Sequence, residues 1–453
     1  MRSRSSLLIL VLTLTAVLAA CGSPWNNPYP DDGATGQVLY GAFNERPKHL
    51  DPVQSYSSNE ITFTAQIYTP PLQYHYLARP FRLEPFAATT LPVVRHLGPD
   101  GQPVDSKSSQ EVAYSVYEIH IRPDLRYQPH PAFAQDAAGR PRYQALRSDE
   151  LAGIRTLSDF GETSSREVTA DDFVYQIKRL AHPRLHSPIL GLMTEYIVGL
   201  SEFAIALKEE NDRLRHAGRD REWLDLRRFP LAGVEVVDRH TFRVTLKGRY
   251  PQFVYWLAMP FFAPMPFEAD RFYAQPGLAE KNISLDWYPV GSGPYMLTRN
   301  DPNREMVLER NPNYFEERYP EEGEPADHDS GFLNDAGTRL PMIDRAVFSL
   351  EKESIPYWNK FLQGYYDFSG ITSDAFDQAV QVSSSGGPVL TAEMREKGMS
   401  LSTAVAPSTF YLGFNMLDSV VGGGSEQARQ LRQAISIAVD YEEFIAIFLN
   451  GRA

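Results

Sequence analysis

The sequence predicts a mixed α/β fold that is divided into two or more lobes. The chain has 453 residues, whereas a single hydrophobic core rarely grows beyond roughly 250–300 residues. Some segments alternate apolar and polar residues with the period of a strand, and others repeat apolar residues with the period of a helix. The composition, 43% hydrophobic and 22% charged, is that of a globular protein.

The chain start has the pattern of an export signal. Arg2 and Arg4 precede an apolar run over Leu7–Ala20, which is shorter than the roughly 20 residues that span a bilayer. The run ends in "LAAC", and this start resembles a bacterial lipoprotein signal, in which the cysteine carries the lipid. We therefore predict a signal peptide at 1–20 and lipid attachment at Cys21, the single cysteine of the chain. An ordinary secretory signal followed by a stray cysteine is the alternative.

Residues 21–37 are rich in Gly, Pro, Asn and Asp and follow neither period, so we expect a flexible tether. The net charge of −13 argues against nucleic acid or an anionic bilayer as a partner. Membrane contact is therefore expected through the lipid alone.

Strands are predicted from alternation. Residues 117–122 ("YEIHIR") and 241–247 ("TFRVTLK") each present one apolar face. Because "VEVVDRH" precedes the second segment, we expect a hairpin that turns at Asp238–His240. Further on, "YML" and "MVLER" are expected to be strands on either side of "TRNDPNRE". The residues expected to point inward are Tyr117, Ile119, Ile121, Phe242, Val244 and Leu246.

Helices follow a different period. In "TADDFVYQIKRLAHP", Thr169 is the expected N-cap, Asp172 stands at N3, and Pro183 ends the helix. Near the chain end, Asp440 and Glu443 are expected to cap a helix that ends at Gly451, after a first helix. The expected apolar faces are Phe173, Ile177, Leu180 and Ala181 in the early helix, and Leu431, Ile435 and Ala438 in the late one.

Two segments are less regular. Residues 131–168, rich in Arg, Ala and Gly, are expected to form an excursion loop, and residues 206–228, dense in both charges, a solvated helix. A surface that binds nucleic acid would be the functional interpretation of the second segment. Acidic residues are interleaved with the basic ones throughout it, which argues against that interpretation.

The stretch "VGSGP" at 290–294 raises the question of catalysis. A nucleophile elbow needs Gly-x-Ser-x-Gly between a strand and a helix. A phosphate-binding loop needs Gly-Lys-Ser/Thr at a helix start. Neither pattern occurs there. We interpret the stretch as a turn that shapes a sheet, in which Gly291 and Gly293 take backbone angles closed to other residues.

Other candidate sites also have structural explanations. His182 and His186 in "HPRLH" are separated by Pro183, which breaks the helical register that a zinc pair would need. The helix dipole favours Asp171–Asp172 at a helix start. The stretch "GGGS" at 422–425 is interpreted as a loop that ends in a Ser N-cap. The sequence thus predicts no catalytic group, no metal site and no cofactor.

Seven segments occur in the order seen in the extracellular solute-binding proteins of family 5, the peptide- and oligopeptide-binding components of ABC importers. The resemblance runs from about Leu39 to Ala453, through "LDPVQSYSSNEITFTAQIYTPPLQY", "YEIHIRPDLRY", "VTADDFVYQIKRLAHP", "VGSGPYML", "VLERNPNYF", "FYLGFNM" and "RQAISIAVDYEEFIAIFLNG". It implies a two-lobed fold like that of periplasmic binding proteins, with an extra inserted subdomain. Ligand would enter a cleft between lobes, which close by hinge motion and dock on a membrane permease.

By this resemblance, the residues just after "LDP" line the cleft, and here these are Tyr56, Ser57 and Ser58. Main-chain pairing can hold a peptide there as an added strand, while roomy pockets accept varied side chains. A plain surface loop is the alternative interpretation. The implied partners are a peptide or another small solute and ABC permease subunits. The implied protein is a monomer and not an enzyme, lipid-anchored in the periplasm or on the cell surface.

The resemblance assigns residues 38–395 to the first lobe, with an inserted subdomain at about 56–234, and residues 396–453 to the start of the second lobe. The segment 131–168 enlarges the inserted subdomain. Family members continue well beyond the helix pair at Ser425–Leu449, so we expect this sequence to be truncated and its second lobe to be incomplete.

Two other functions stay open. One is the same fold with a non-peptide ligand, such as an oligosaccharide, a metal chelate or a peptide-like antibiotic. The aromatic fraction of 12% suits sugar stacking, but core packing explains it equally well. The other is a surface hydrolase or a structural envelope lipoprotein. Turnover of a substrate would favour a hydrolase, whereas a binding protein melts at a ligand-dependent temperature without forming product.

A lobe without its returning segment would expose apolar surface and an open sheet edge. We therefore expect this 453-residue form, expressed without its signal, to be unstable or to bind poorly. A monodisperse sample that melts cooperatively and binds peptide at micromolar strength would contradict this expectation.

Overall fold

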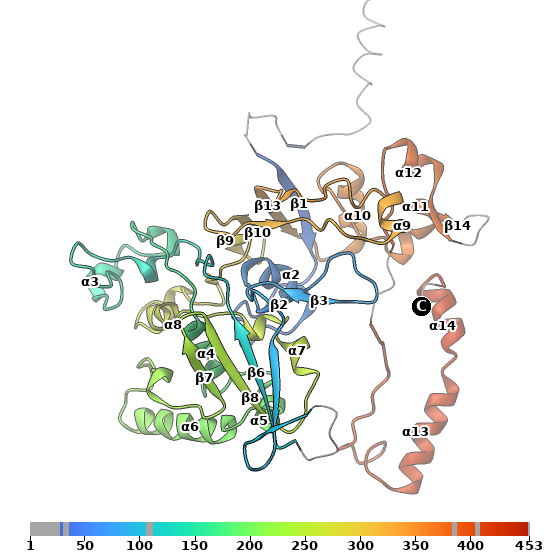
Figure 1. Ribbon diagram of the computed structural model, residues 1–453. Coiled ribbons are helices and arrows are strands. Elements are labelled where there is room, and N and C mark those ends of the chain that lie inside the picture. The colour runs from blue at the N-terminus through green and yellow to red at the C-terminus, as the bar shows by residue number, and fades with distance from the viewer. Residues whose placement is uncertain (1–27, 30–35, 106–111, 383–386, 404–407, 452–453) are drawn as a thin grey trace, which may run out of the picture. The chain divides into compact units, whose positions relative to one another are not determined.

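The computed structural model describes residues 28–29, 36–105, 112–382, 387–403 and 408–451 (Figure 1). The predicted signal peptide, Cys21 and most of the predicted tether lie outside them. The described residues form two compact units. Those between Gly33 and Leu350 make the larger unit, and those up to Asp32 together with those of Glu351–Ala453 make the smaller one. In this part of the chain, no helix has both the length and the apolar character needed to cross a membrane.

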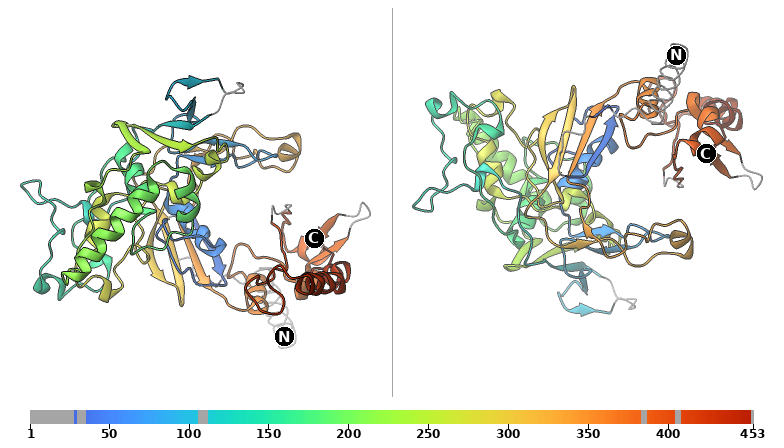
Figure 2. Two further views of the ribbon diagram at one scale, coloured as in Figure 1. Left: turned by 90° about the horizontal axis from the view of Figure 1, so that it is seen from below. Right: turned by 90° about the horizontal axis from the view of Figure 1, so that it is seen from above.

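The larger unit contains a four-stranded sheet with the strand order β1-β13-β10-β9 (Figure 2). Its strands are β1 (Val38–Phe43), β9 (Tyr295–Asp301), β10 (Glu305–Arg310) and β13 (Arg345–Leu350). β1 pairs with β13 in parallel, and the other pairs are antiparallel. The predicted strands "YML" and "MVLER" are confirmed, because they form the β9–β10 hairpin. Since β1 and β13 come from distant parts of the chain, their pairing closes the unit on itself.

A five-stranded antiparallel sheet, ordered β5-β4-β6-β8-β7, contains the predicted alternating segments. Its strands are β4 (Val93–Leu97), β5 (Pro103–Val104), β6 (Tyr114–His120), β7 (Val234–Asp238) and β8 (Thr241–Lys247). β7 and β8 form the predicted hairpin. All the residues predicted to point inward are buried, namely Tyr117, Ile119, Ile121, Phe242, Val244 and Leu246. The prediction of mixed α/β class is likewise confirmed, because helices pack on these sheets.

Helix α4 (Ala170–Arg179) packs beside β7 and β8 (Figure 1). Thr169 is its N-cap, as predicted, and its backbone N–H donates to Oδ2 of Asp172 at 2.9 Å. The Phe173 ring stacks on that of Phe242 in β8, with 5.3 Å between centroids. The predicted apolar face is confirmed, because all its members are buried: Phe173, Ile177, Leu180 and Ala181.

The predicted solvated helix over 206–228 is wrong in its bounds. Helix α6 spans Leu200–His216. It starts after Gly199, with φ of 76°, and ends before Gly218, with φ of 69°. A left-handed residue interrupts an α-helix, and glycine takes that conformation without steric cost. The helix does hold opposite charges at helical spacing, as in the pair Glu210–Arg213.

The segment 131–168 is irregular, as expected of a loop, but part of it packs into the core. It contains the 3₁₀ turns η1 (Pro131–Phe133) and η2 (Leu157–Asp159) and the short helix α3 (Ser148–Leu151). Its buried core members include Phe133, Leu151, Phe160 and Val168. The segment is therefore not a purely superficial excursion.

The remaining elements of the larger unit are short. They are α2 (Ser58–Ile67), β2 (Leu72–Tyr74), β3 (Leu83–Pro85), α5 (Leu190–Tyr196), η3 (Leu226–Arg228), α7 (Phe253–Trp256), η4 (Pro260–Phe262), α8 (Phe267–Tyr273), η5 (Ala279–Lys281), β11 (Glu317–Arg318), α9 (Pro325–Asp329) and β12 (Arg339–Leu340). β2 pairs with β3, and β11 pairs with β12.

The Gly-Ser-Gly stretch packs against the carboxyl end of α2, where the N–H of Gly293 donates to the carbonyl of Ile67 at 2.8 Å. Neither glycine has a positive φ, so the predicted reason for them is wrong. A Cβ on Gly291 would lie 1.9 Å from the Ile67 oxygen, and one on Gly293 would lie 2.6 Å from the Gln66 oxygen. Glycine is required there because two backbones approach each other closely. Ser292 between them is buried.

The described residues of the smaller unit form helices, 3₁₀ turns and a two-stranded sheet. Its elements are α10 (Ser354–Leu362), η6 (Ser373–Ala375), α11 (Phe376–Ala379), β14 (Val380–Val382), β15 (Pro388–Leu390), α12 (Ala392–Glu396), α13 (Glu426–Ala438) and α14 (Tyr441–Phe448). A small core gathers around Trp358 and Met394.

Ser425 and Asp440 are the N-caps of the last two helices, as predicted, and Glu443 takes part through its backbone N–H. The Oγ of Ser425 accepts the N–H of Ala428 at 3.2 Å, and Oδ1 of Asp440 accepts the N–H of Glu443 at 2.9 Å. The predicted end of the second helix is wrong by three residues, because α14 ends at Phe448. The predicted face residues Leu431, Ile435 and Ala438 lie within α13.

Replacing Gly291 with Ala should lower the free energy of unfolding by about 3 kcal/mol or more, because the new Cβ would overlap the Ile67 oxygen. Gly191 is the control, since a Cβ there meets nothing within 4 Å. Its replacement by Ala should change the stability by at most about 1 kcal/mol. Urea unfolding followed by circular dichroism compares the two variants, and equal stabilities would contradict the packing assignment.

Candidate functional site

The three predicted ligand-binding residues lie at the start of α2. Ser57 is the N-cap of the helix, Ser58 is its first residue, and Tyr56 precedes both. All three are exposed, Tyr56 to 63%. The Tyr56 ring lies beside that of Phe261, with 6.3 Å between centroids. The structure thus brings the three residues together on an accessible surface of the larger unit.

Glu60, in the first turn of α2, binds both ends of the loop Lys48–Ser57, which carries Tyr56. Its Oε1 accepts the backbone N–H groups of Lys48 at 3.1 Å and His49 at 2.9 Å. Its Oε2 accepts those of Tyr56 at 2.8 Å and Ser57 at 3.1 Å. Burial alone would raise the pKa of Glu60, but the N–H groups of Tyr56, Ser57 and His49 lower it below its usual value. The charged carboxylate therefore holds the two ends of the loop together.

Two aspartates hold the middle of the same loop. Oδ1 of Asp286 accepts the N–H groups of Leu50 and Asp51, both at 3.1 Å. Oδ1 of Asp51 accepts the N–H of Val53 at 3.0 Å. The other oxygen of Asp286 lies 3.3 Å from Nδ1 of His49. Burial, and then the charge of Asp51, raise the pKa of Asp286 above its usual value.

Most N–H groups of this loop are therefore committed to side chains of the protein itself. The three carboxylates receive seven of them. Pairing with an added ligand strand cannot use the N–H groups of Tyr56 and Ser57 unless their bonds to Glu60 break. The side chains of Tyr56, Ser57 and Ser58, in contrast, are exposed.

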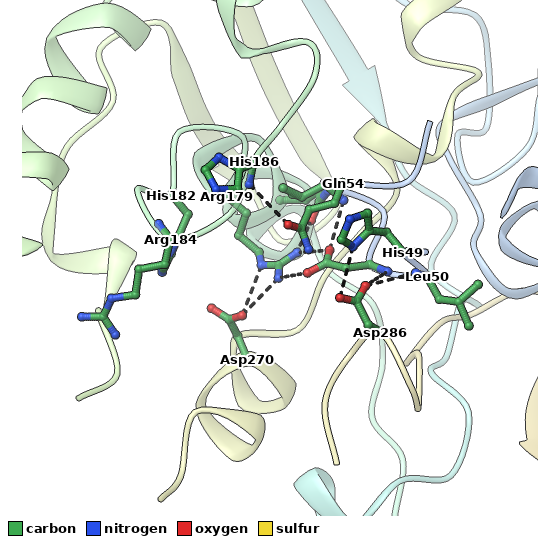
Figure 3. Close-up of polar contacts among 12 residues, drawn as sticks. His49, Leu50, Gln54, Arg179, His182, Arg184, His186, Asp270 and Asp286 are labelled. Atoms are coloured by element: carbon green, nitrogen blue, oxygen red, sulfur yellow. Dashed lines mark hydrogen bonds and ion pairs between the residues drawn. The ribbon is translucent and has the colours of Figure 1, made fainter. Parts of the chain in front are cut away.

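Arg179 anchors the loop to the core of the unit (Figure 3). Its guanidinium is 1% exposed and donates to both oxygens of Asp51, at 2.9 and 2.7 Å. It also donates to Oδ1 of Asp270 in α8, at 3.3 and 3.2 Å. The hydroxyl of Tyr175 donates to the other oxygen of Asp270 at 2.7 Å. Arg179 and Asp51 are buried and Asp270 is partly buried, so loss of one partner would leave another charge unpaired.

The environment keeps Arg179 and Asp270 ionised. Burial would lower the pKa of Arg179, but Asp51 and Asp270 raise it. Burial would raise the pKa of Asp270, but Arg179, with smaller effects of His182 and Tyr175, holds it below its usual value. Burial lowers the pKa of His182 to about 4, so its ring is neutral at physiological pH.

A pocket of about 680 Å³ opens beside the cluster, which is within the range of roughly 300–1,000 Å³ for small-molecule sites. Its lining includes Asp51, Gln54, Arg184, Trp223, Asp270 and Asp286. Tyr56, Ser57 and Ser58 do not line it. The structure therefore separates the predicted ligand-binding residues from this pocket, although both adjoin the same loop.

His182 and His186 have separate roles. Nδ1 of His182 accepts the N–H of Arg184 at 3.1 Å. His186 is exposed, and its backbone N–H donates to Oε1 of Gln54 at 3.3 Å. Among the residues described here, no group of three or more His, Cys, Asp or Glu side chains could hold a metal ion.

Sequence reasoning missed the residues that hold the loop. Glu60 had a local signal, because it stands three residues after Ser57, the spacing of a capping box. The others come from segments that meet only in the folded chain, so no local pattern links them. They are Asp51, Arg179, Asp270 and Asp286.

Comparison with known proteins identifies the family. The model of "Bacterial extracellular solute-binding proteins, family 5 Middle" matches residues 161–453, which is more than half of the chain. The chain therefore belongs to family 5 of the bacterial extracellular solute-binding proteins, as the seven segments predicted.

Three relatives are similar over part of their length. The periplasmic oligopeptide-binding protein OppA of Salmonella typhimurium is 31% identical over 150 residues, 33% of this chain and 23% of that protein. OppA of Escherichia coli is 30% identical over 229 residues, 49% of this chain and 36% of that protein. The probable deoxycholate-binding periplasmic protein YgiS of Escherichia coli is 22% identical over 215 residues, 48% of this chain and 35% of that protein. The matched segments thus cover well under half of each relative.

Solved structures of similar proteins match at low identity. OppA of Burkholderia pseudomallei matches with a TM-score of 0.45 and 16% identity, over 76% of this chain and 48% of that chain. OppA of Listeria monocytogenes bound to peptide matches with a TM-score of 0.46 and 15% identity, over the same shares.

Replacing Arg179 with Leu should lower the free energy of unfolding by about 3–5 kcal/mol, because the buried Asp51 and the partly buried Asp270 would lose their cation. The control is Arg221→Leu, which removes the exposed partner of Glu280 and should leave the stability close to that of the wild type. Urea unfolding measures both variants. A loss of the same size in each would contradict the anchoring role of Arg179.

Proposed function

We propose that this protein is the extracytoplasmic substrate-binding component of an ABC importer and that it captures peptides or oligopeptides. The observation that carries the proposal is the family match over residues 161–453. The identities of 31% and 30% to two oligopeptide-binding proteins favour peptides as the ligand class. The bound solute would then pass to permease subunits in the membrane.

Tyr56, Ser57 and Ser58 are the proposed ligand contacts. Their exposure and their fixed loop support this role, because a rigid, accessible aromatic ring offers a large contact area at low entropic cost. Two hydroxyl side chains beside it can donate or accept hydrogen bonds. This combination fits a ligand with both apolar side chains and a polar backbone.

A non-peptide solute is the second candidate. The relative YgiS, whose name specifies deoxycholate, favours it at 22% identity. Deoxycholate is therefore the second test ligand. Binding of deoxycholate without binding of any peptide would replace the first proposal by the second.

The proposed location is outside the cytoplasm, as a monomer held at the membrane by lipid on Cys21 alone. The apolar run before "LAAC" supports it. Labelling with radioactive palmitate should mark the wild type and not Cys21→Ser, and labelling of both proteins would contradict the anchor. The proposed function includes no bond-breaking step, so formation of product from a bound peptide would contradict it as well.

Tyr56→Ala should weaken peptide binding about tenfold, because the loop would lose its one exposed aromatic contact. The test ligands are tri-, tetra- and penta-alanine, titrated calorimetrically to millimolar concentration so that weak binding is detected. Tyr76→Ala is the matched control, since Tyr76 is 64% exposed and lies outside the loop. Equal affinity of Tyr56→Ala and wild type would refute the role of Tyr56, and no binding at all would refute the peptide ligand.

A further inference from the structure

The carboxylate of Glu60 joins the two ends of the loop that runs from Lys48 to Ser57. It is 3% exposed, and one oxygen accepts the N–H groups of Lys48 and His49 while the other accepts those of Tyr56 and Ser57. We propose that Glu60 is a positioning residue for ligand binding, which fixes Tyr56 and Ser57 in place before the ligand arrives. This inference rests on the proposed role of the loop in ligand contact.

The chemistry of this contact requires glutamate. An ionised carboxylate offers about four acceptor sites and no donor, and four N–H groups use them here. Glutamine in the same place would turn its NH₂ group toward one pair of N–H groups. Aspartate would keep the charge, but it is one methylene shorter and cannot reach both pairs equally.

The middle of the loop has its own supports. Asp286 holds the N–H groups of Leu50 and Asp51. The hydroxyl of Tyr68 donates to the carbonyl of Leu50 at 2.9 Å. Loss of the Glu60 contacts would therefore free the ends of the loop without releasing its middle.

A freed end matters because Tyr56 has few other restraints. Its side chain is largely exposed, and its ring pairs with that of Phe261 among the aromatic residues described here. Fixing Tyr56 beforehand removes the entropy cost of ordering it during binding. A contact residue held by a supporting layer of hydrogen bonds is also placed more accurately than one on a free loop. Glu60 thus acts on affinity through Tyr56 and does not touch the solute.

A role as helix cap alone is the competing explanation. In that case, Glu60 would stabilise α2, and its loss would lower the stability without changing the affinity for a ligand. One measurement must therefore report on the loop, and a second must report on binding.

The loop measurement needs no ligand. Amide hydrogen exchange over residues 44–60 is compared in the wild type, in Glu60→Gln and in the control Glu118→Gln. Glu118 is a partly buried carboxylate in β6 that pairs with Arg95 and Arg243 outside the loop. Exchange at Tyr56 and Ser57 should rise about tenfold in Glu60→Gln and stay unchanged in the control. Unchanged exchange in Glu60→Gln would overturn the inference, whether or not the protein binds peptides.

The binding measurement uses the same alanine peptides and the full chain. Glu60→Gln should weaken the affinity about tenfold, Glu60→Asp should weaken it less, and Glu118→Gln should bind like the wild type. Faster exchange together with wild-type affinity would identify Glu60 as a helix cap only and overturn the inference.

Two further outcomes are decisive. If the wild type binds none of the peptides, the proposed peptide function fails, and the ligand role of Glu60 fails with it, while the exchange data still report its hold on the loop. If neither Glu60 variant melts cooperatively, Glu60 is needed for folding itself, and the positioning role is overturned.

Discussion

The larger unit depends on the pairing of one buried cation, Arg179, with Asp51 and Asp270. This pairing joins the loop after β1, helix α4 and helix α8, three segments that are distant in the chain. A buried charge that loses its partner is strongly destabilising, so the three segments cannot separate independently. The loop that presents Tyr56 is thereby fixed to the same helix that packs on the five-stranded sheet.

Carboxylate groups inside this unit hold the backbone of the loop Lys48–Ser57 in place. Glu60, Asp286 and Asp51 bind N–H groups that a short irregular loop cannot pair with carbonyls of its own. Hydrogen bonds to ionised acceptors are roughly twice as strong as neutral ones, so a few carboxylates can order the whole loop. The arrangement leaves the side chains of residues 56–58 exposed.

Local patterns predicted much of the fold and little of the site. Alternation located β6 and β8, and capping residues located α4 and α13, because these features depend on neighbours within a few positions. The helix predicted at 206–228 was misplaced because Gly199 and Gly218, which have positive φ, set the ends of the real helix. A pattern of charges carries no information about backbone φ. Gly291 was predicted to need a special backbone angle. Its real constraint is the backbone of Ile67, in a distant segment, which leaves no room for a Cβ. The ion cluster of Arg179 depends on such distant contacts throughout, and the ligand role of Tyr56, Ser57 and Ser58 stays a prediction from family resemblance.

The parallel pairing of β1 with β13 has a mechanical consequence. Val38 lies opposite Arg345 and Phe43 opposite Leu350, so the chain enters the pair at one end and leaves it at the other. A pull between the chain ahead of Val38 and the chain beyond Leu350 would therefore act along the strands. Such a force loads the inter-strand hydrogen bonds in shear, all at once, and does not peel them apart singly. The unit should therefore resist stretching between Val38 and Leu350.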